Sequence, residues 1–327
     1  MTDFTIAIPT YNGEQRLPQL LERLRGQTDV ASITWEVIVV DNNSQDGTAR
    51  VVQEFQTNFP CPLRYYLEPQ QGAAHARRCA IQVAQSDLIG FLDDDNLPAS
   101  DWVSAALQFA QTHPTAGAFG SRIVGDFEVE PPQNFKPLLP FLAIIDRGPQ
   151  PLRYQSWRKV LPPSAGLVVR KQAWITSVPQ QTILAGRVQG SMLTGEDTEA
   201  LSYIQKHGWE IWYNPEMNIV HTIPAWRLEK EYLIKLFRGI GHSRYVTRMI
   251  EVKPEYRWLM QFMYAANDLR KLLWHILCYR QKIKTDLAAA CRMELLTSSL
   301  MSPIYLHRQG IILKQRPMIS SFSGELH

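Results

Sequence analysis

Short apolar runs alternate with amphipathic segments through the first part of the chain. Residues 4–12, 35–40, 63–67 and 88–92 are rich in Val, Ile, Leu and Phe, which predicts strands. Between these runs, apolar side chains recur every three or four positions, which predicts helices. This alternation of strands and helices indicates an α/β sheet domain.

The alternation is interrupted over residues 127–163, which contain eight prolines. Because proline lacks a backbone N–H and breaks regular elements, we expect an insertion or loop over the sheet edge. The regular pattern resumes with a strand at 165–170, a helix at 196–207 and a strand-like run at 210–213. From about Trp226 onward the pattern is helical.

The composition is that of an ordinary globular protein, with 327 residues of which 45% are hydrophobic and 20% are charged. The four cysteines show no CxxC pairing, so we expect neither a zinc site nor a disulfide framework. No signal-peptide pattern is visible, and no apolar stretch reaches the roughly 18 residues of a membrane span. We therefore expect a cytoplasmic location.

Charge is distributed unevenly along the chain. Residues 226–327 carry 17 Lys and Arg against 8 Asp and Glu, a net charge of +9. Residues 1–225 carry 17 against 23, a net charge of −6. We expect an acidic domain over 1–225 that can hold a metal, followed by a basic helical extension over 226–327 that can face phosphates or an anionic membrane surface.

An apolar stripe runs along the helix predicted for residues 258–280, with Lys and Arg in or beside it. Such a stripe is typical of a helix that lies in the plane of a membrane surface. It is also typical of a helix packed on its own domain, and we favour packing. The stripe consists of Trp258, Phe262, Ala266, Leu269, Leu273 and Ile276.

Three consecutive aspartates, Asp93, Asp94 and Asp95, follow the apolar run at 88–92. Like charges at this spacing raise one another's pKa unless a cation neutralises them. Carboxylate oxygens suit Mg²⁺ or Mn²⁺, and these ions bind phosphates. The sequence therefore predicts a metal site, with a solvated acidic turn as the alternative.

Further polar residues lie at the ends of predicted elements. Asp41 ends the second strand, Glu196 and Asp197 open a helix, and His221 follows a short apolar run. In open α/β sheets ligands bind outside the carboxyl ends of the strands, which is where Asp41 lies. The alternatives are capping roles for Asp41 and Asp197, and a structural role for His221.

Together these motifs resemble those of family 2 glycosyltransferases of the polysaccharide-biosynthesis type, over about residues 4–245. The resemblance implies the GT-A nucleotide-diphospho-sugar transferase fold, a Rossmann-like mixed sheet flanked by helices, here with a C-terminal helical extension. It implies a catalytic domain over 1–225, with a donor-binding half at about 1–98 and an acceptor half at about 99–225. The matching motifs are Pro9-Thr10-Tyr11-Asn12, residues 39–44, residues 91–96, Gly195-Glu196-Asp197, and Tyr213-Asn214-Pro215 leading to His221.

The resemblance also assigns roles on the donor side. It implies that Asp41 accepts hydrogen bonds from a uracil or a ribose, and that Asp93 reaches the ribose or a metal-bound water. Asp95 and His221 are the implied ligands of a Mn²⁺ or Mg²⁺ ion. The whole predicted donor-binding set is Pro9, Thr10, Tyr11, Asn12, Asp41, Asp93, Asp94 and Arg244.

On the acceptor side, the resemblance implies that Asp197 is the general base and that Glu196 lies beside it. Asp197 would take the proton from an acceptor hydroxyl as that oxygen attacks the anomeric carbon. Positioned proton transfer of this kind contributes roughly 10²–10⁴ in rate. A single displacement inverts the anomeric centre.

We therefore predict an inverting, divalent-metal-dependent glycosyltransferase of polysaccharide and cell-envelope biosynthesis. We expect a UDP-sugar in preference to a GDP-sugar as donor, a saccharide or lipid-linked acceptor, and peripheral contact with the inner face of the plasma membrane. The alternatives are a non-catalytic GT-A-like scaffold or sugar-binding protein, and a sugar-nucleotide nucleotidyltransferase. The last needs a basic, glycine-rich loop after the first strand, where only Gly13 and Arg16 occur. No nucleic-acid-binding motif is present.

Overall fold

The computed structural model describes residues 2–132, 134–156, 160–188 and 191–311 of the chain. In the first part, strands and helices alternate as the apolar pattern predicts. Strands buried on both faces need continuous apolar residues, whereas the helices that cover them need one apolar side. The elements are β1 (Phe4–Thr10), α1 (Leu17–Arg25), β2 (Trp35–Asp41), α2 (Thr48–Gln56), β3 (Leu63–Leu67), α3 (Ala73–Val83) and β4 (Leu88–Phe91).

The second part contains longer strands and an irregular stretch. Within 127–163 the described residues form only short elements after the end of β6, as the prolines predict. The run at 210–213 is only the start of a fourteen-residue strand, so its predicted length was wrong. The elements are β5 (Asn96–Pro98), α4 (Trp102–Thr112), β6 (Ala116–Phe127), the 3₁₀ helix η1 (Lys136–Leu142), β7 (Leu152–Arg153), β8 (Leu167–Arg170), α5 (Lys171–Ser177), α6 (Glu196–Lys206) and β9 (Glu210–Ile223).

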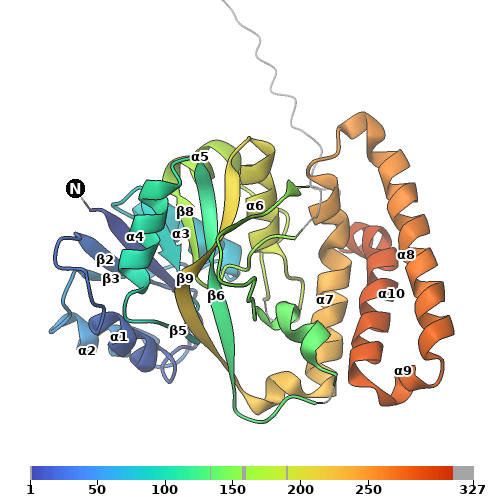
Figure 1. The fold of residues 1–327 in the computed structure, drawn as a ribbon, viewed down its shortest axis with the longest axis horizontal. Helices are drawn as coiled ribbons and strands as arrows, with labels where there is room; N and C mark the ends of the chain where they lie inside the picture. Colours follow the sequence, from blue (N-terminus) through green and yellow to red (C-terminus); the bar gives the residue numbers. More distant parts are fainter. Residues whose placement is uncertain (1, 133, 157–159, 189–190, 312–327) are drawn as a thin grey trace, which may run out of the picture.

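The strands form one mixed sheet in the order β3-β2-β1-β4-β8-β6-β9-β5, with β7 paired to β9. Strands β1 to β4 are parallel to one another, whereas β8 is antiparallel to both β4 and β6. Helices cover both faces of the sheet (Figure 1). The predicted mixed α/β sheet is confirmed.

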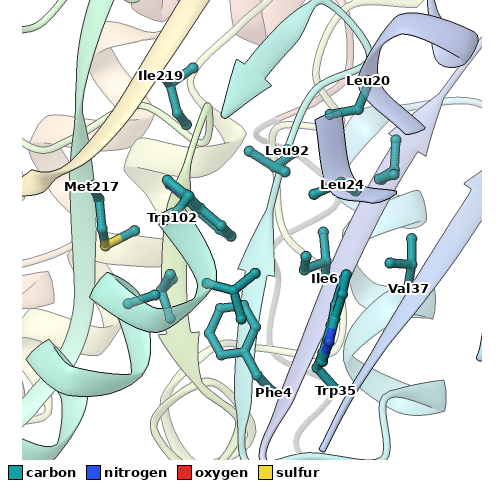
Figure 2. Packing of buried hydrophobic residues seen from close by; sticks show 14 of the residues in the cluster. Phe4, Ile6, Leu20, Leu24, Trp35, Val37, Leu92, Trp102, Met217 and Ile219 are labelled. Carbon is teal, nitrogen blue, oxygen red and sulfur yellow. The ribbon is translucent and has the colours of Figure 1, made fainter. Parts of the chain in front are cut away.

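A large aromatic core fixes the position of β4 and so of the acidic residues that follow it. The rings of Phe4 and Trp102 meet edge to face, with centroids 5.9 Å apart (Figure 2). Gly90 of β4 faces this pair, and a Cβ atom there would lie 2.6 Å from Trp102 and 2.9 Å from Phe4. Only glycine therefore leaves room for both rings against this strand.

The C-terminal helices form a layer beside the sheet domain (Figure 1). Helix α7 packs closely on α10, because a Cβ atom at Gly241 would lie 3.0 Å from backbone atoms of Leu295 and Ser299. The predicted helical extension is confirmed, while a division of function near residue 225 stays a prediction. Its elements are η3 (Ala225–Leu228), α7 (Lys230–Met249), η4 (Pro254–Tyr256), α8 (Arg257–Tyr279), α9 (Lys282–Thr285) and α10 (Leu287–Arg308).

The apolar stripe of α8 does not pack on the catalytic domain, so the favoured expectation was wrong. Trp258, Phe262, Leu269, Leu273 and Ile276 are all exposed. The side chains of α8 that are buried are instead polar, namely Asp268 and His275. A helical period shows that two sides of a helix differ, but it does not show which side faces the protein.

Candidate active site

A cleft of about 1010 Å³ opens at the carboxyl ends of β1 and β4, where open α/β sheets bind ligands. Its floor includes the residues that follow these two strands. One wall is the start of α6 together with the residues before it, and another is the adjoining side of α7. The helical extension therefore contributes to the cleft directly.

Asp94 holds the two strand ends together. Its carboxylate accepts two hydrogen bonds from Arg16, at 2.8 and 3.0 Å, and one from Thr10 Oγ1 at 2.6 Å. Burial raises the pKa of Asp94, although the contacts with Arg16 oppose this shift. Both carboxylate oxygens have partners from the protein, and the predicted donor contact of Asp94 stays a prediction.

Asp95 lies beside His221 because β5 pairs with β9 and places Asn96 opposite His221. Asp95 Oδ2 is 3.4 Å from His221 Nε2 and 2.9 Å from Arg227 Nη2. Arg227 Nη1 lies 3.0 Å from His221 Nε2. Burial opposes ionisation of Asp95, but the contacts with His221 and Arg227 outweigh it and hold the pKa of this carboxyl below its ordinary value.

The ring of His221 has different surroundings at its two nitrogens. Nε2 faces both the Arg227 guanidinium, which can only donate, and the Asp95 carboxylate, which can only accept, so its role depends on the ring tautomer. Nδ1 is buried and has no hydrogen-bond partner among the described residues. A neutral imidazole with a free lone pair on Nε2 is the form that binds a metal.

The residues fit a divalent cation, provided that Arg227 moves. Asp95 Oδ2 and His221 Nε2 both contact the positively charged guanidinium of Arg227, so a metal ion would take the place of that group. Oxygen and imidazole nitrogen are ligands that suit Mn²⁺. Within the described part of the chain, no group of three or more His, Cys, Asp or Glu residues is arranged to hold a metal. An ion bound to Asp95 and His221 would thus take its other ligands from a phosphate or from water.

Asp197 lies in the first turn of α6 and lines the cleft. Its carboxylate accepts hydrogen bonds from the backbone N–H of Thr198, at 2.6 Å, and of Ser164, at 3.1 Å. Burial raises the pKa of Asp197, and the neighbouring charge of Glu196 raises it further against the opposing effect of Arg77. A carboxylate with a raised pKa is a better base than an ordinary aspartate.

Arg77 is a functional candidate that the sequence pattern did not reveal. It is buried on α3, where it donates hydrogen bonds to Glu196 Oε1 at 3.0 Å and to Ser164 Oγ at 2.6 Å. Its Nη2 also lies 3.4 Å from Asp93 Oδ1. Burial lowers the pKa of Arg77, but the charges of Asp93 and Glu196 more than offset this. One guanidinium therefore connects the end of β4 to the start of α6.

The predicted nucleotide-binding residues fall into two groups. Pro9, Thr10 and Tyr11 line the cleft. Asn12 and Asp41 instead organise the loop after β2: Asn12 Oδ1 accepts from Gln45 N at 2.8 Å, and Asp41 accepts from Ser44 N at 2.8 Å and from Tyr65 Oη at 2.7 Å. Their contacts with a donor stay predictions.

Arginines dominate the positive charge of the cleft. Arg244 of α7 lines it, and burial lowers the pKa of this side chain to about 10. Arg238 of the same helix does not line the cleft and pairs with Glu294 of α10. Arg187, which donates to Tyr232 Oη at 3.0 Å, was not singled out from the sequence. The arginines that line the cleft are Arg16, Arg77, Arg147, Arg187, Arg227 and Arg244.

Part of the chain is similar in sequence to a known family. Residues 5–163 match Glycosyl transferase family 2. Glycosyltransferase AglE of Haloferax volcanii is 33% identical over 99 residues, which are 30% of this chain and 32% of that protein. Succinoglycan biosynthesis protein ExoM of Rhizobium meliloti is 29% identical over 118 residues, 35% of this chain and 37% of that protein. The chain thus matches only about a third of the length of these curated relatives.

Solved structures agree on the fold. The mannosyltransferase PcManGT from Pyrobaculum calidifontis, in complex with GDP-Man and Mn²⁺, has a TM-score of 0.61 at 17% identity, over 95% of this chain and 87% of that one. TarS 1-349 of S. aureus, in complex with UDP-GlcNAc, has a TM-score of 0.51 at 15% identity, over 94% and 92%. The fold is therefore that of the GT-A glycosyltransferases. Residues 5–163 match the model of glycosyl transferase family 2, so the resemblance predicted from the motifs is confirmed over this part of the chain.

Proposed function

We propose that the chain is an inverting, divalent-metal-dependent glycosyltransferase that moves a sugar from a nucleotide-diphosphate donor to an acceptor hydroxyl. One observation carries this proposal. Asp197, the candidate base, lines the same cleft as Asp95 and His221, the candidate cation-binding pair. Arg77 links the two sides of this cleft, because it contacts Glu196 next to Asp197 and Asp93 near Asp95. Glycosyl transfer needs both, because a proton leaves the acceptor while negative charge builds on the leaving diphosphate.

On the acceptor side, Asp197 is the group that accepts the proton. The N–H groups of Thr198 and Ser164 fix the position of its carboxylate. Its raised pKa makes it a better base than Asp95, whose pKa is lowered. Asp94 also has a raised pKa, but Arg16 and Thr10 occupy its carboxylate. Glu196 is occupied by Arg77 and by the N–H of Gly195, which leaves it a positioning role.

On the donor side, Asp95 and His221 would hold Mn²⁺ or Mg²⁺, and such an ion offsets the negative charge of the departing nucleoside diphosphate. Arg227 now holds these two side chains and would be released toward the phosphates of a donor. Arg187 and Arg244 also line the cleft and supply further positive charge. Pro9, Thr10 and Tyr11 would line the base pocket.

The acceptor that we propose is a saccharide or a lipid-linked saccharide in polysaccharide biosynthesis of the cell envelope. Two similar proteins support this, namely the succinoglycan biosynthesis protein ExoM and the poly(ribitol-phosphate) β-N-acetylglucosaminyltransferase TarS. We propose a cytoplasmic protein that contacts the inner face of the plasma membrane peripherally. The net charge of +9 over residues 226–327 supports this location.

A donor screen tests the proposal. Purified protein is incubated with UDP- and GDP-sugars, with and without Mn²⁺, and the released nucleoside diphosphate is measured. We expect nucleoside diphosphate to be released from one class of donor, UDP-sugars in preference to GDP-sugars. We also expect Mn²⁺ to increase the rate of this release. Structural relatives with each nucleotide are known, so both must be included. Donor binding without release, even with a range of saccharide acceptors, would point to a sugar-binding scaffold instead.

A further inference from the structure

Helix α8 turns its polar side toward the protein and its apolar side toward solvent. Asp268 is 1% exposed and accepts hydrogen bonds from Arg248 at 2.5 and 3.0 Å. His275 is 3% exposed, and its Nε2 lies 2.9 Å from the carbonyl oxygen of Ala289 on α10. These polar contacts fix the rotation of the helix about its axis.

The outward side of α8 is mostly apolar from its first turn to its last. Trp258 is 73% exposed, Phe262 70% and Trp274 68%. Monomeric soluble proteins rarely leave a continuous apolar surface of this kind uncovered, which points to a binding surface. We call this surface the α8 apolar face, and its residues are Trp258, Phe262, Leu269, Leu273, Trp274 and Leu277.

The charge around this face indicates what covers it. Asp268 is the sole acidic residue in the sequence of α8, and it is buried against Arg248. Arg270 and Lys271 are exposed on the helix. Three more exposed basic residues, Arg280, Lys282 and Lys284, follow its C-terminal end. A second copy of the chain on the same face would bring these like charges together, whereas an anionic lipid surface would neutralise them.

We propose that the α8 apolar face docks in the plane of an anionic lipid bilayer, with the flanking Lys and Arg at the headgroups. None of the helices among the described residues has the length and apolar character of a membrane span. A helix with one apolar side and basic flanks instead suits the plane of the bilayer surface. Tryptophan suits such a surface, since its ring is apolar and its N–H remains near water. This inference extends the peripheral location proposed above and is independent of the transferase chemistry.

Docking through α8 leaves the cleft open. Helix α8 lies at the outer side of the helical layer, with α10 and α7 between it and the sheet (Figure 1). The cleft is lined by the opposite side of this layer, through Ser243, Arg244 and Thr247 of α7. The enzyme could therefore remain on a bilayer while a donor enters from the cytoplasm.

Vesicle co-sedimentation of the full chain tests the docking face. The vesicles are phosphatidylcholine alone, or phosphatidylcholine mixed with phosphatidylglycerol. We expect binding to the mixed vesicles, and weaker binding as salt screens the basic residues. The double variant Phe262→Ser/Trp274→Ser should bind about tenfold more weakly or worse, because two exposed anchors are lost. Ile175→Ser is the matched control, since Ile175 of α5 is 59% exposed but lies outside this face, and it should bind as the wild type does.

Two outcomes would overturn the inference. One is that the wild type ignores the mixed vesicles, or that the double variant binds them equally well. The other is a wild-type dimer where the double variant is a monomer, which would show that a second copy covers the face.

Binding of UDP and of GDP with Mn²⁺ is measured on the same samples. We expect the double variant to bind the same nucleotide as the wild type does. If the wild type bound neither nucleotide but still docked through α8, the transferase proposal would fail and the docking face would stand.

Discussion

Asp95 and Asp197 are both largely buried carboxylates of one cleft, but their surroundings shift their pKa values in opposite directions. Asp95 is surrounded by cations and imidazole, which hold its pKa below the ordinary value despite burial. Asp197 contacts two backbone N–H groups and has Glu196 as a neighbour, so burial and like charge raise its pKa. Pairs of titratable groups with diverging pKa values commonly mark separate roles in catalysis. This contrast supports our proposal that Asp95 binds a cation and that Asp197 accepts the proton.

The largest expected effect is at the cation side of this comparison. Asp95→Asn removes the charge that Arg227 neutralises and that a metal ion would need. We expect Mn²⁺-stimulated donor binding to be abolished, and turnover with it, as measured by titration calorimetry and nucleoside diphosphate release. Asp101→Asn, at the exposed start of α4, is the control and should behave as wild type. Unchanged Mn²⁺-dependent binding in folded Asp95→Asn protein would remove Asp95 from the metal site.

The next effect concerns the residue that connects the two walls. Arg77→Met leaves Glu196 without its buried cation, so we expect the free energy of unfolding to fall by about 3 kcal/mol or more. Arg50→Met is the control, because Arg50 pairs with Glu14 at the surface and should cost less than about 1 kcal/mol. Denaturant unfolding measures both. Equal costs for the two variants would mean that Arg77 is not a buried link.

A smaller effect concerns Glu199, a buried carboxyl one helical turn from Glu196. Burial raises the pKa of Glu199 from 4.5 to about 7, although the N–H groups of Ile183 and Leu184 oppose the shift. The folded state therefore binds this proton more tightly than the unfolded state does. Stability from this group is complete below about pH 4.5 and is lost as pH rises to 7, by up to about 3 kcal/mol.

Glu199→Gln should flatten this part of the stability profile. The measurement is the free energy of unfolding of both proteins at several pH values between 4.5 and 7. Slopes are compared rather than absolute stabilities, since the amide keeps only one of the two hydrogen-bond acceptors. The same slope in both proteins would show that Glu199 is ionised in the folded state at all these pH values.

The sequence predicts much of the sheet because local pattern and burial agree there. Strand β2 is buried on both faces and apolar except for Glu36 and its last residue, Asp41, and its pattern alone places it. Strand β9 was only partly predicted, since Asn214 and Pro215 interrupt its apolar run and its register with β6 shifts between Ser121 and Arg122. Pairing across the sheet, not local propensity, makes that strand continuous.

The candidate site was only partly predictable for a related reason. The acidic motifs stand at strand and helix ends, where a sequence pattern can reveal them. Arg77 acquires its role from Glu196, 119 residues further along the chain, and no local spacing reports that contact. One signal was available, since Arg77 lies among small residues on the buried side of α3, where a charged side chain needs a partner.

The variant Asp197→Asn is decisive for the proposal that Asp197 is the base of a transferase. The amide keeps the size of the carboxyl but does not accept the proton. On a donor that the wild type uses, we expect turnover to fall by about 10²-fold or more while donor affinity is retained. Turnover near that of the wild type, in protein that folds and binds donor normally, would show that Asp197 is not the base and only stabilises the start of α6.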